Sequence, residues 1–267
     1  PRELVLPEAR TLDSDVLEAY QEAIKSYSEK ARKNLSIFSD SEGELAGSNC
    51  FAPLTLRNFL PAGARLSTMA DLGRATEINP DFLSGFYSDT GLVLRTAGDS
   101  HAPNDFLAKD LAAQLKERGI DLRNPKIIYF DALDLRQDTN SYGLAFDLNE
   151  RAKPEENIID APELVSDFRF RTINEKGIPV RDDKGNRTLY ARKDGLSRFC
   201  LYRDSDVGSN FRVLACSGDY GRVVVVSAEG TRADFSTYLT NLQRIRDEEI
   251  AKIQKRYAQA EEVLRGK

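Results

Sequence analysis

A small acidic group around the only histidine is the first candidate for catalysis. Asp99 and His101 lie in a loop after one apolar stretch, and Asp131 ends the next one. Carboxylates beside an imidazole can transfer protons or hold Mg²⁺. The group therefore predicts a hydrolase-like active site with Asp99, His101 and Asp131 as catalytic candidates. The alternative is that these residues only form a turn and cap a helix.

A strand, a helix and a second strand would bring these three side chains together. Gly91–Thr96 and Lys126–Phe130 are apolar runs with the length of buried strands. Asn104–Arg118 between them has helical periodicity and is followed by Gly119, a typical helix terminator. This succession is typical of a βαβ-like unit. Ligands of open α/β sheets bind beyond the carboxyl ends of the strands, which is where the three candidates fall.

A second candidate site is the stretch from Asp167 to Arg203, where basic and aromatic residues alternate. Ten basic and five acidic residues give it a local charge of +5, in a chain whose net charge is −5. Single nucleic-acid strands are bound by basic and aromatic side chains together. The predicted contact residues are Arg169, Arg171, Arg192 and Arg198. The alternative is that Phe168 and Phe170 face a core, so that the basic face is merely solvated.

Long amphipathic helices are expected at both ends of the chain. Apolar residues recur at helical spacing from Leu17 to Phe38 and from Phe235 to Leu264, the latter with a heptad-like, coiled-coil seam. A helix of about 34 residues is about 50 Å long, more than the width of a compact domain of this size. The C-terminal helix must therefore lie against the N-terminal one, another subunit or a partner. The predicted interface residues are Tyr20, Ile24, Tyr27, Ile250, Ile253 and Tyr257.

The remaining pattern indicates an α+β fold. From Asp167 onward, short period-two stretches separated by glycine-rich turns, with residues 211–216 among them, predict an antiparallel sheet after a mixed N-terminal part. Helices and strands segregate more than they alternate, which favours α+β. We expect an N-terminal amphipathic helix in 1–38, a globular domain in 39–230 and a long helix in 231–267. A sub-boundary is expected near 150–160.

Composition narrows the class of protein further. Forty per cent hydrophobic and 30% charged residues are ordinary for a soluble chain. Three cysteines without a C-x-x-C motif, and no apolar leader at the N-terminus, predict a cytoplasmic protein without structural zinc. The longest apolar runs are too short to span a membrane. A pI of about 5.2 argues against nucleic acid as a partner of the whole surface.

One short segment resembles a known family. Residues 63–75, Gly-Ala-Arg-Leu-Ser-Thr-Met-Ala-Asp-Leu-Gly-Arg-Ala, are similar to the helix-opening stretch of formylglycine-generating and related C-type-lectin-like domains. Ser67 stands where that family has proline, and Leu72 stands where it has tryptophan. The resemblance implies a C-type-lectin-like fold as an alternative and transfers no active-site residue. Thr68-x-x-Asp71 within it is also a helix capping box.

These patterns favour a binding or assembly protein whose terminal helices mediate self-association or contact with a protein partner. The alternatives are the hydrolase-like enzyme and a protein that binds nucleic acid or another polyanion on the basic sheet. The chain has no P-loop, dinucleotide-binding glycine motif, nucleophile elbow or HExxH motif, which favours binding over catalysis. No cofactor is expected for a binding role, and Mg²⁺ is expected only for the enzyme.

The helix interface leads to a mutational prediction. Ile253→Asp should change the oligomeric state or lower the free energy of unfolding by several kcal/mol, because it places a charge without a partner in a buried seam. Light scattering and thermal melts of the wild type and the variant measure both effects. A monomeric wild type whose size and melting temperature are unaffected by the substitution would contradict the predicted interface.

Overall fold

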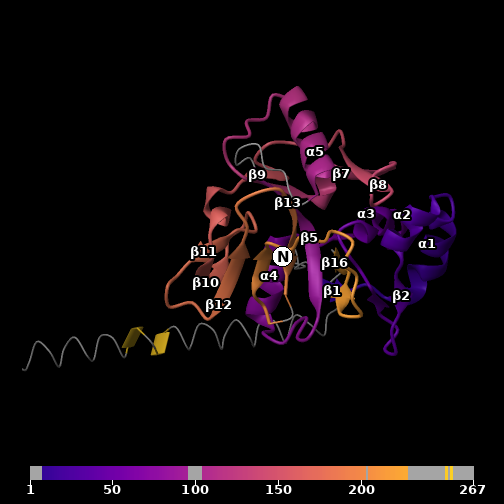
Figure 1. Ribbon diagram of the computed structural model, residues 1–267. Coiled ribbons are helices and arrows are strands. Elements are labelled where there is room, and N and C mark those ends of the chain that lie inside the picture. The colour runs from indigo at the N-terminus through magenta and orange to yellow at the C-terminus, as the bar shows by residue number, and fades with distance from the viewer. Residues whose placement is uncertain (1–7, 96–103, 203, 228–249, 252, 255–267) are drawn as a thin grey trace, which may run out of the picture. The chain divides into compact units, whose positions relative to one another are not determined.

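The computed structural model describes residues 8–95, 104–202, 204–227, 250–251 and 253–254 (Figure 1). Residues Ala9–Ser227 form one compact unit, and the two chain ends form a second unit. In the second unit, Ile250 and Ile253 are helical, and their side chains are about half exposed in the single chain. Tyr257 and most of the predicted C-terminal helix lie outside the described residues. The length and partner of that helix therefore stay predictions.

A mixed sheet of eleven strands forms the centre of the larger unit. Its main path consists, in spatial order, of β11 (Pro179–Arg181), β10 (Phe168–Ile173), β12 (Arg187–Ala191), β14 (Val207–Ser209), β13 (Leu196–Leu201), β5 (Tyr87–Leu94), β15 (Gly221–Arg222), β3 (Leu45–Ala46) and β2 (Phe38–Ser39). Two further strands, paired in the order β5–β6–β9, are β6 (Lys126–Tyr129) and β9 (Ile158–Asp160). The two smaller sheets consist of β1 (Glu8–Thr11), β16 (Val224–Ser227) and β4 (Ala64–Leu66), and of β7 (Leu133–Gln137) with β8 (Leu144–Leu148).

Helices cover both faces of this sheet, and β5 and β6 are buried from both sides. Leu92 and Ile128 pack into one hydrophobic core, whereas Val93 and Ile127 pack into a second one. Burial on both faces explains why these strands are continuous apolar runs. The first core takes residues of α1 (Leu17–Ile24), α2 (Glu29–Leu35), α3 (Ala52–Leu56) and α5 (Asp105–Glu117), and the second takes residues of α4 (Met69–Ile78). The described residues also form four 3₁₀ helices: η1 (Ser14–Val16), η2 (Arg57–Phe59), η3 (Phe130–Ala132) and η4 (Pro162–Val165).

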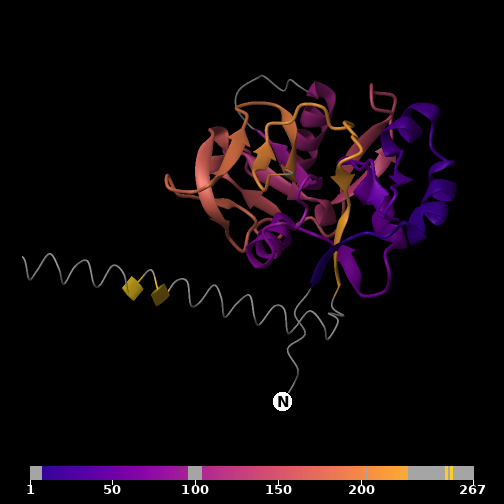
Figure 2. The same cartoon turned by 90° about the horizontal axis from the view of Figure 1, so that it is seen from below.

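The two ends of the unit differ in character. Figures 1 and 2 show α1 and α2, drawn in indigo, at one end, and β10, β11 and β12, drawn in orange-red, at the other.

The presence of both helices and mixed sheets confirms the α+β class, with two corrections to its details. β5 and β6 run antiparallel, so the strand–helix–strand segment is not a βαβ unit. In the C-terminal sheet, β12 and β14 are parallel. The pairs β10–β11, β10–β12 and β13–β14 are antiparallel, as expected.

The N-terminal amphipathic stretch forms two short helices rather than one long helix. α1 ends at Ile24, and Ser28 begins α2 by accepting a hydrogen bond from the backbone N–H of Ala31. A serine side chain that bonds a backbone N–H three residues later starts a new helix, which interrupts the earlier one. Phe38, the last residue of the predicted stripe, lies in β2.

The segment before β15 also differs from the prediction. Residues 211–216 were expected to form a strand, but the structure has none there. Side chains bind the backbone of this segment instead: Asn104 Nδ2 donates to the Arg212 carbonyl, and the Cys50 thiol donates to the Leu214 carbonyl. Because these carbonyls are bound by side chains, they are not paired with a neighbouring strand.

The capping box that opens α4 is confirmed and is buried. Asp71 accepts hydrogen bonds from the backbone and hydroxyl of Thr68 and from the guanidinium groups of Arg65 and Arg74. Burial alone would raise the pKa of Asp71, but the bonds from Arg65 and Thr68 outweigh it and lower the pKa to about 2.

Asp71 should therefore make stability depend on acidity. Its folded pKa lies below its unfolded value of about 3.9, so its contribution is complete above pH ~4 and is lost as the pH falls toward 2. We expect Asp71→Asn to lower the free energy of unfolding at pH 7 by about 2 kcal/mol and to flatten its pH dependence between 4 and 2. Urea titrations across this range measure both effects. Asp81→Asn, an exposed control, should change neither, and an unaltered pH profile in Asp71→Asn would contradict the assignment.

Candidate functional site

The catalytic candidates are only partly within the described residues. Asp131 lies in η3, where its side chain is partly exposed and its carbonyl accepts a hydrogen bond from Asn149 Nδ2 at 3.0 Å. Asp99 and His101 lie outside the described residues. In the part of the chain that the structure describes, no three His, Cys, Asp or Glu side chains are arranged to hold a metal ion. The hydrolase-like site and its Mg²⁺ thus remain predictions.

The basic sheet has the two faces expected from its alternation. Phe168 and Phe170 are buried, and Arg169 and Arg171 are exposed on the outer face of β10. Arg171 Nε is 3.1 Å from Asp182 Oδ2 in an ion pair at the surface. Arg169 lies directly opposite Thr188 of β12. Residues opposite each other in a sheet point to the same face, so this outer face continues across β12.

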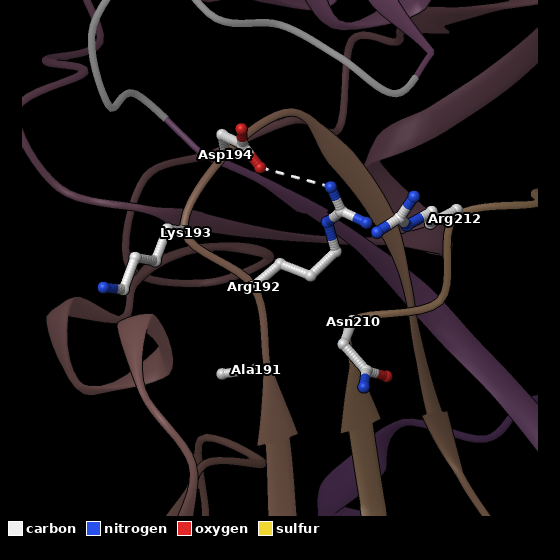
Figure 3. A pocket seen from close by; sticks show the side chains of 6 residues that line it. All are labelled: Ala191, Arg192, Lys193, Asp194, Asn210 and Arg212. Atoms are coloured by element: carbon white, nitrogen blue, oxygen red, sulfur yellow. Dashed lines mark hydrogen bonds and ion pairs between the residues drawn. The ribbon is translucent and has the colours of Figure 1, made fainter.

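The outer face leads to an open hollow of about 310 Å³, which we call the basic hollow. It is lined by Ala191, Arg192, Lys193, Asp194, Asn210 and Arg212 (Figure 3). The parallel pairing of β12 with β14 brings these residues together. Ala191 lies beside Ser209, so the segments that follow the two strands begin at the same edge of the sheet. Figure 3 shows the guanidinium groups of Arg192 and Arg212 turned toward each other, while Lys193 points away from them.

Positive charge exceeds negative charge in this hollow. Arg192 Nη2 is 3.2 Å from Asp194 Oδ1, and both groups are partly buried. Arg192 Nε is fully buried, and among the described residues it has no hydrogen-bond partner. Arg212 is exposed, and among the described residues no carboxylate other than Asp194 lines the hollow. A buried donor without an acceptor costs free energy.

A further cation lies beneath the hollow. Arg95 is 2% exposed and donates to the Arg192 and Ser209 carbonyls, at 2.5 Å each, and to the hydroxyls of Ser197 and Ser209. Among the described residues, no carboxylate forms an ion pair with it. Burial, and then the charge of Arg192, lower the pKa of Arg95 to about 9, so the group stays charged at neutral pH. Its charge in a low-dielectric interior adds to the positive potential of the hollow.

Arg198 does not belong to the exposed basic face. Its side chain is 3% exposed and forms a bidentate ion pair with Asp89, at 2.6 and 2.5 Å. Burial would lower the pKa of Arg198, but the charge of Asp89 and its hydrogen bonds raise the pKa well above its ordinary value. The predicted polyanion contact at Arg198 is therefore wrong, because the guanidinium is fully engaged inside the protein.

The predicted interface residues of the first helix belong to the core of their own unit. Tyr20 is fully buried, with its hydroxyl donating to the Leu35 carbonyl, and Ile24 is 9% exposed. Tyr27 packs against the same core and is partly buried. Tyr20 and Ile24 consequently have no free surface to offer a partner helix, and their role is in packing.

Sequence reasoning identified Arg192 but missed Arg95, Asn210 and Arg212. Arg95 lies within the segment Gly91–Thr96 that was predicted to be a buried strand, which was a usable signal of a buried cation. Arg212 lies in the segment 211–216 that was wrongly predicted as a strand, and Asn210 directly precedes that segment. Their proximity to Arg192 depends on the parallel pairing of β12 and β14, which local patterns do not encode.

No protein-family model, curated protein or solved structure matches the chain. The similarity of residues 63–75 to C-type-lectin-like domains therefore assigns no family. No helix within the described residues has both the length and the apolar character needed to cross a membrane.

The buried pair beneath the site gives a stability prediction. Asp89→Asn should lower the free energy of unfolding by about 3–5 kcal/mol, because it leaves the Arg198 charge buried without its partner. Denaturant unfolding measures the loss. Asp182→Asn removes the exposed partner of Arg171 and should change stability little. Equal effects of the two substitutions would contradict the importance given to the buried pair.

Proposed function

We propose that this protein binds a polyanion through the basic hollow and the adjoining outer face of β10 and β12. The observation that carries the proposal is the pair of converging guanidinium groups, Arg192 and Arg212, with only one carboxylate among the lining residues. Guanidinium groups match the planar, bidentate geometry of phosphate and carboxylate oxygens. This binding role replaces assembly through the N-terminal helix as the leading hypothesis, since Tyr20 and Ile24 are buried.

The surroundings of the hollow support a chain-like anion rather than a single ion. The hollow is open, and Lys193 at its rim points outward. Arg169 and Thr188 lie on the same outer face, which leads through β12 to Arg192. A ligand that carries repeated negative charges can reach both the hollow and this face. Arg169 and Arg192 thus keep the role predicted for them, and Arg171 contributes less because Asp182 pairs with it.

The proposal is tested with long-chain polyphosphate, which carries charge but no other recognition group. The double variant Arg192→Ala/Arg212→Ala should lower the affinity at 50 mM salt at least about tenfold and reduce the slope of log affinity against log salt by about 2. Fluorescence competition or calorimetry at several salt concentrations gives both values.

The matched control removes two arginines that do not line the hollow. Arg123 and Arg151 are exposed on loops elsewhere in the unit. Arg123→Ala/Arg151→Ala changes the net charge equally and should leave affinity and salt slope close to wild type. Equal losses in both double variants would show that net charge alone is responsible and would refute the site. Absence of polyphosphate binding at 50 mM salt would refute the function.

A further inference from the structure

Three aromatic side chains, which we call the aromatic row, lie beside the basic hollow. The ring centroids of Tyr190 and Tyr202 are 6.2 Å apart, and those of Tyr202 and Phe211 are 6.4 Å apart. Tyr190 and Phe211, the two ends of the row, are 36% and 38% exposed. Each of them is a chain neighbour of a residue that lines the hollow. Cationic and aromatic groups therefore occupy one continuous surface.

The middle ring of the row is held by the strand beneath it. Gly208 of β14 lies beside Tyr190, and a Cβ at Gly208 would be only 2.4 Å from the ring and hydroxyl of Tyr202. The missing side chain thus allows Tyr202 to lie over the strand. The Tyr202 hydroxyl donates to Asn210 Oδ1 at 2.9 Å. Because Asn210 lines the hollow, the same residue connects the row and the hollow.

The Phe211 end of the row is held by the buried ion pair. The Arg198 guanidinium is 5.3 Å from the Phe211 ring centroid, within the range of a cation–π contact. The backbone N–H of Arg198 also donates to the Phe211 carbonyl, and Arg198 Nη1 donates to the Cys216 carbonyl. Arg198 is therefore a positioning residue, which supports an exposed ring without itself reaching the surface.

We infer that the basic hollow and the aromatic row together bind an unpaired nucleic-acid strand. Its phosphates contact Arg192 and Arg212, and its bases stack on the exposed faces of Tyr190 and Phe211. The inference rests on the proposed polyanion binding and names the class of polyanion. Stacking on aromatic side chains beside a basic groove is how proteins hold single strands without reading their sequence.

Other polyanions use this surface incompletely. Polyphosphate and sulfated sugars present no aromatic faces, so they would form no stacking contacts with the aromatic row. A duplex presents its phosphates but keeps its base faces stacked inside, where Tyr190 and Phe211 do not reach them. An unpaired strand offers both phosphate charge and accessible base faces, which match a basic hollow beside an aromatic row.

The test compares two labelled strands of about 12 nucleotides, one with bases and one abasic, in fluorescence anisotropy titrations at 50 mM salt. The strand with bases should bind about tenfold more tightly than the abasic strand. Tyr190→Leu and Phe211→Leu should each remove most of this advantage and leave the affinity for the abasic strand unchanged. Tyr190→Phe, which keeps the aromatic face, should retain wild-type affinity. Phe106→Leu, at an exposed ring on α5, serves as the control and should change neither affinity.

A spectroscopic readout separates stacking from a loss of structure. The chain contains no tryptophan, so its fluorescence comes from tyrosine, and stacking of a base on Tyr190 should quench part of it. Tyr190→Phe should bind as tightly as wild type but show less quenching. Strands of DNA and RNA with the same sequence distinguish the two sources of the ligand, and a duplex competitor should displace neither strand efficiently.

The outcomes separate this inference from the function on which it rests. Equal affinities for the strand with bases and the abasic strand would overturn the inference, while polyphosphate binding through Arg192 and Arg212 would still stand. Failure of polyphosphate and of both strands to bind would overturn the two together. Binding of a strand that is unaffected by Tyr190→Leu and Phe211→Leu would also overturn the inference, because the row would then play no part.

Discussion

The buried ion pair between Arg198 and Asp89 holds β13, β5 and the segment after β14 together. Both side chains are essentially excluded from water, and two buried charges are tolerated only when geometry and hydrogen bonding are nearly complete. The pair joins β13 to β5, and the remaining guanidinium donor binds the Cys216 carbonyl. One charged contact thus connects the two central strands to the irregular segment that carries Phe211 and Arg212. Without it, that segment would keep the bonds from Asn104 and Cys50 but would lose its attachment to Arg198.

Arg95 has the complementary role at the other end of β5. Its guanidinium binds carbonyls on both sides of the hollow, one in the turn after β12 and one at the end of β14. This arrangement fixes the backbone beneath the site through neutral acceptors. Among the described residues no carboxylate forms an ion pair with Arg95, although the nearby charge of Asp194 acts to raise its pKa. The two buried arginines therefore differ in kind. The charge of Arg198 is balanced by Asp89, whereas the charge of Arg95 contributes to the positive potential of the hollow.

How much could be predicted from the sequence depended on the range of the interactions. The two apolar strands, α5 with its terminal Gly119 and the Thr68–Asp71 cap were all predictable, because propensity, periodicity and capping act over a few residues. The exposure of Arg169 and the burial of Phe168 followed from simple alternation. Arg198 was misjudged because it lies in a stretch rich in basic residues, and only the distant Asp89 makes it a buried residue. The antiparallel β5–β6 pair and the parallel β12–β14 pair likewise depend on contacts between distant segments.

The position of β14 has a consequence for the order in which this region forms and opens. β12, β13 and β14 follow one another along the chain, yet β14 inserts between the other two in space. The turn from β12 to β13 must therefore pass over the end of β14, and no pair of consecutive strands can form the hollow alone. β14 has only three residues, so it contributes few ladder hydrogen bonds and opens more readily than its long neighbours. A ligand that binds both Arg192 and Arg212 connects the segments on either side of β14, so it should disfavour the local unfolding of that strand. Ligand binding would then slow amide exchange in β14, although the ligand does not touch this strand.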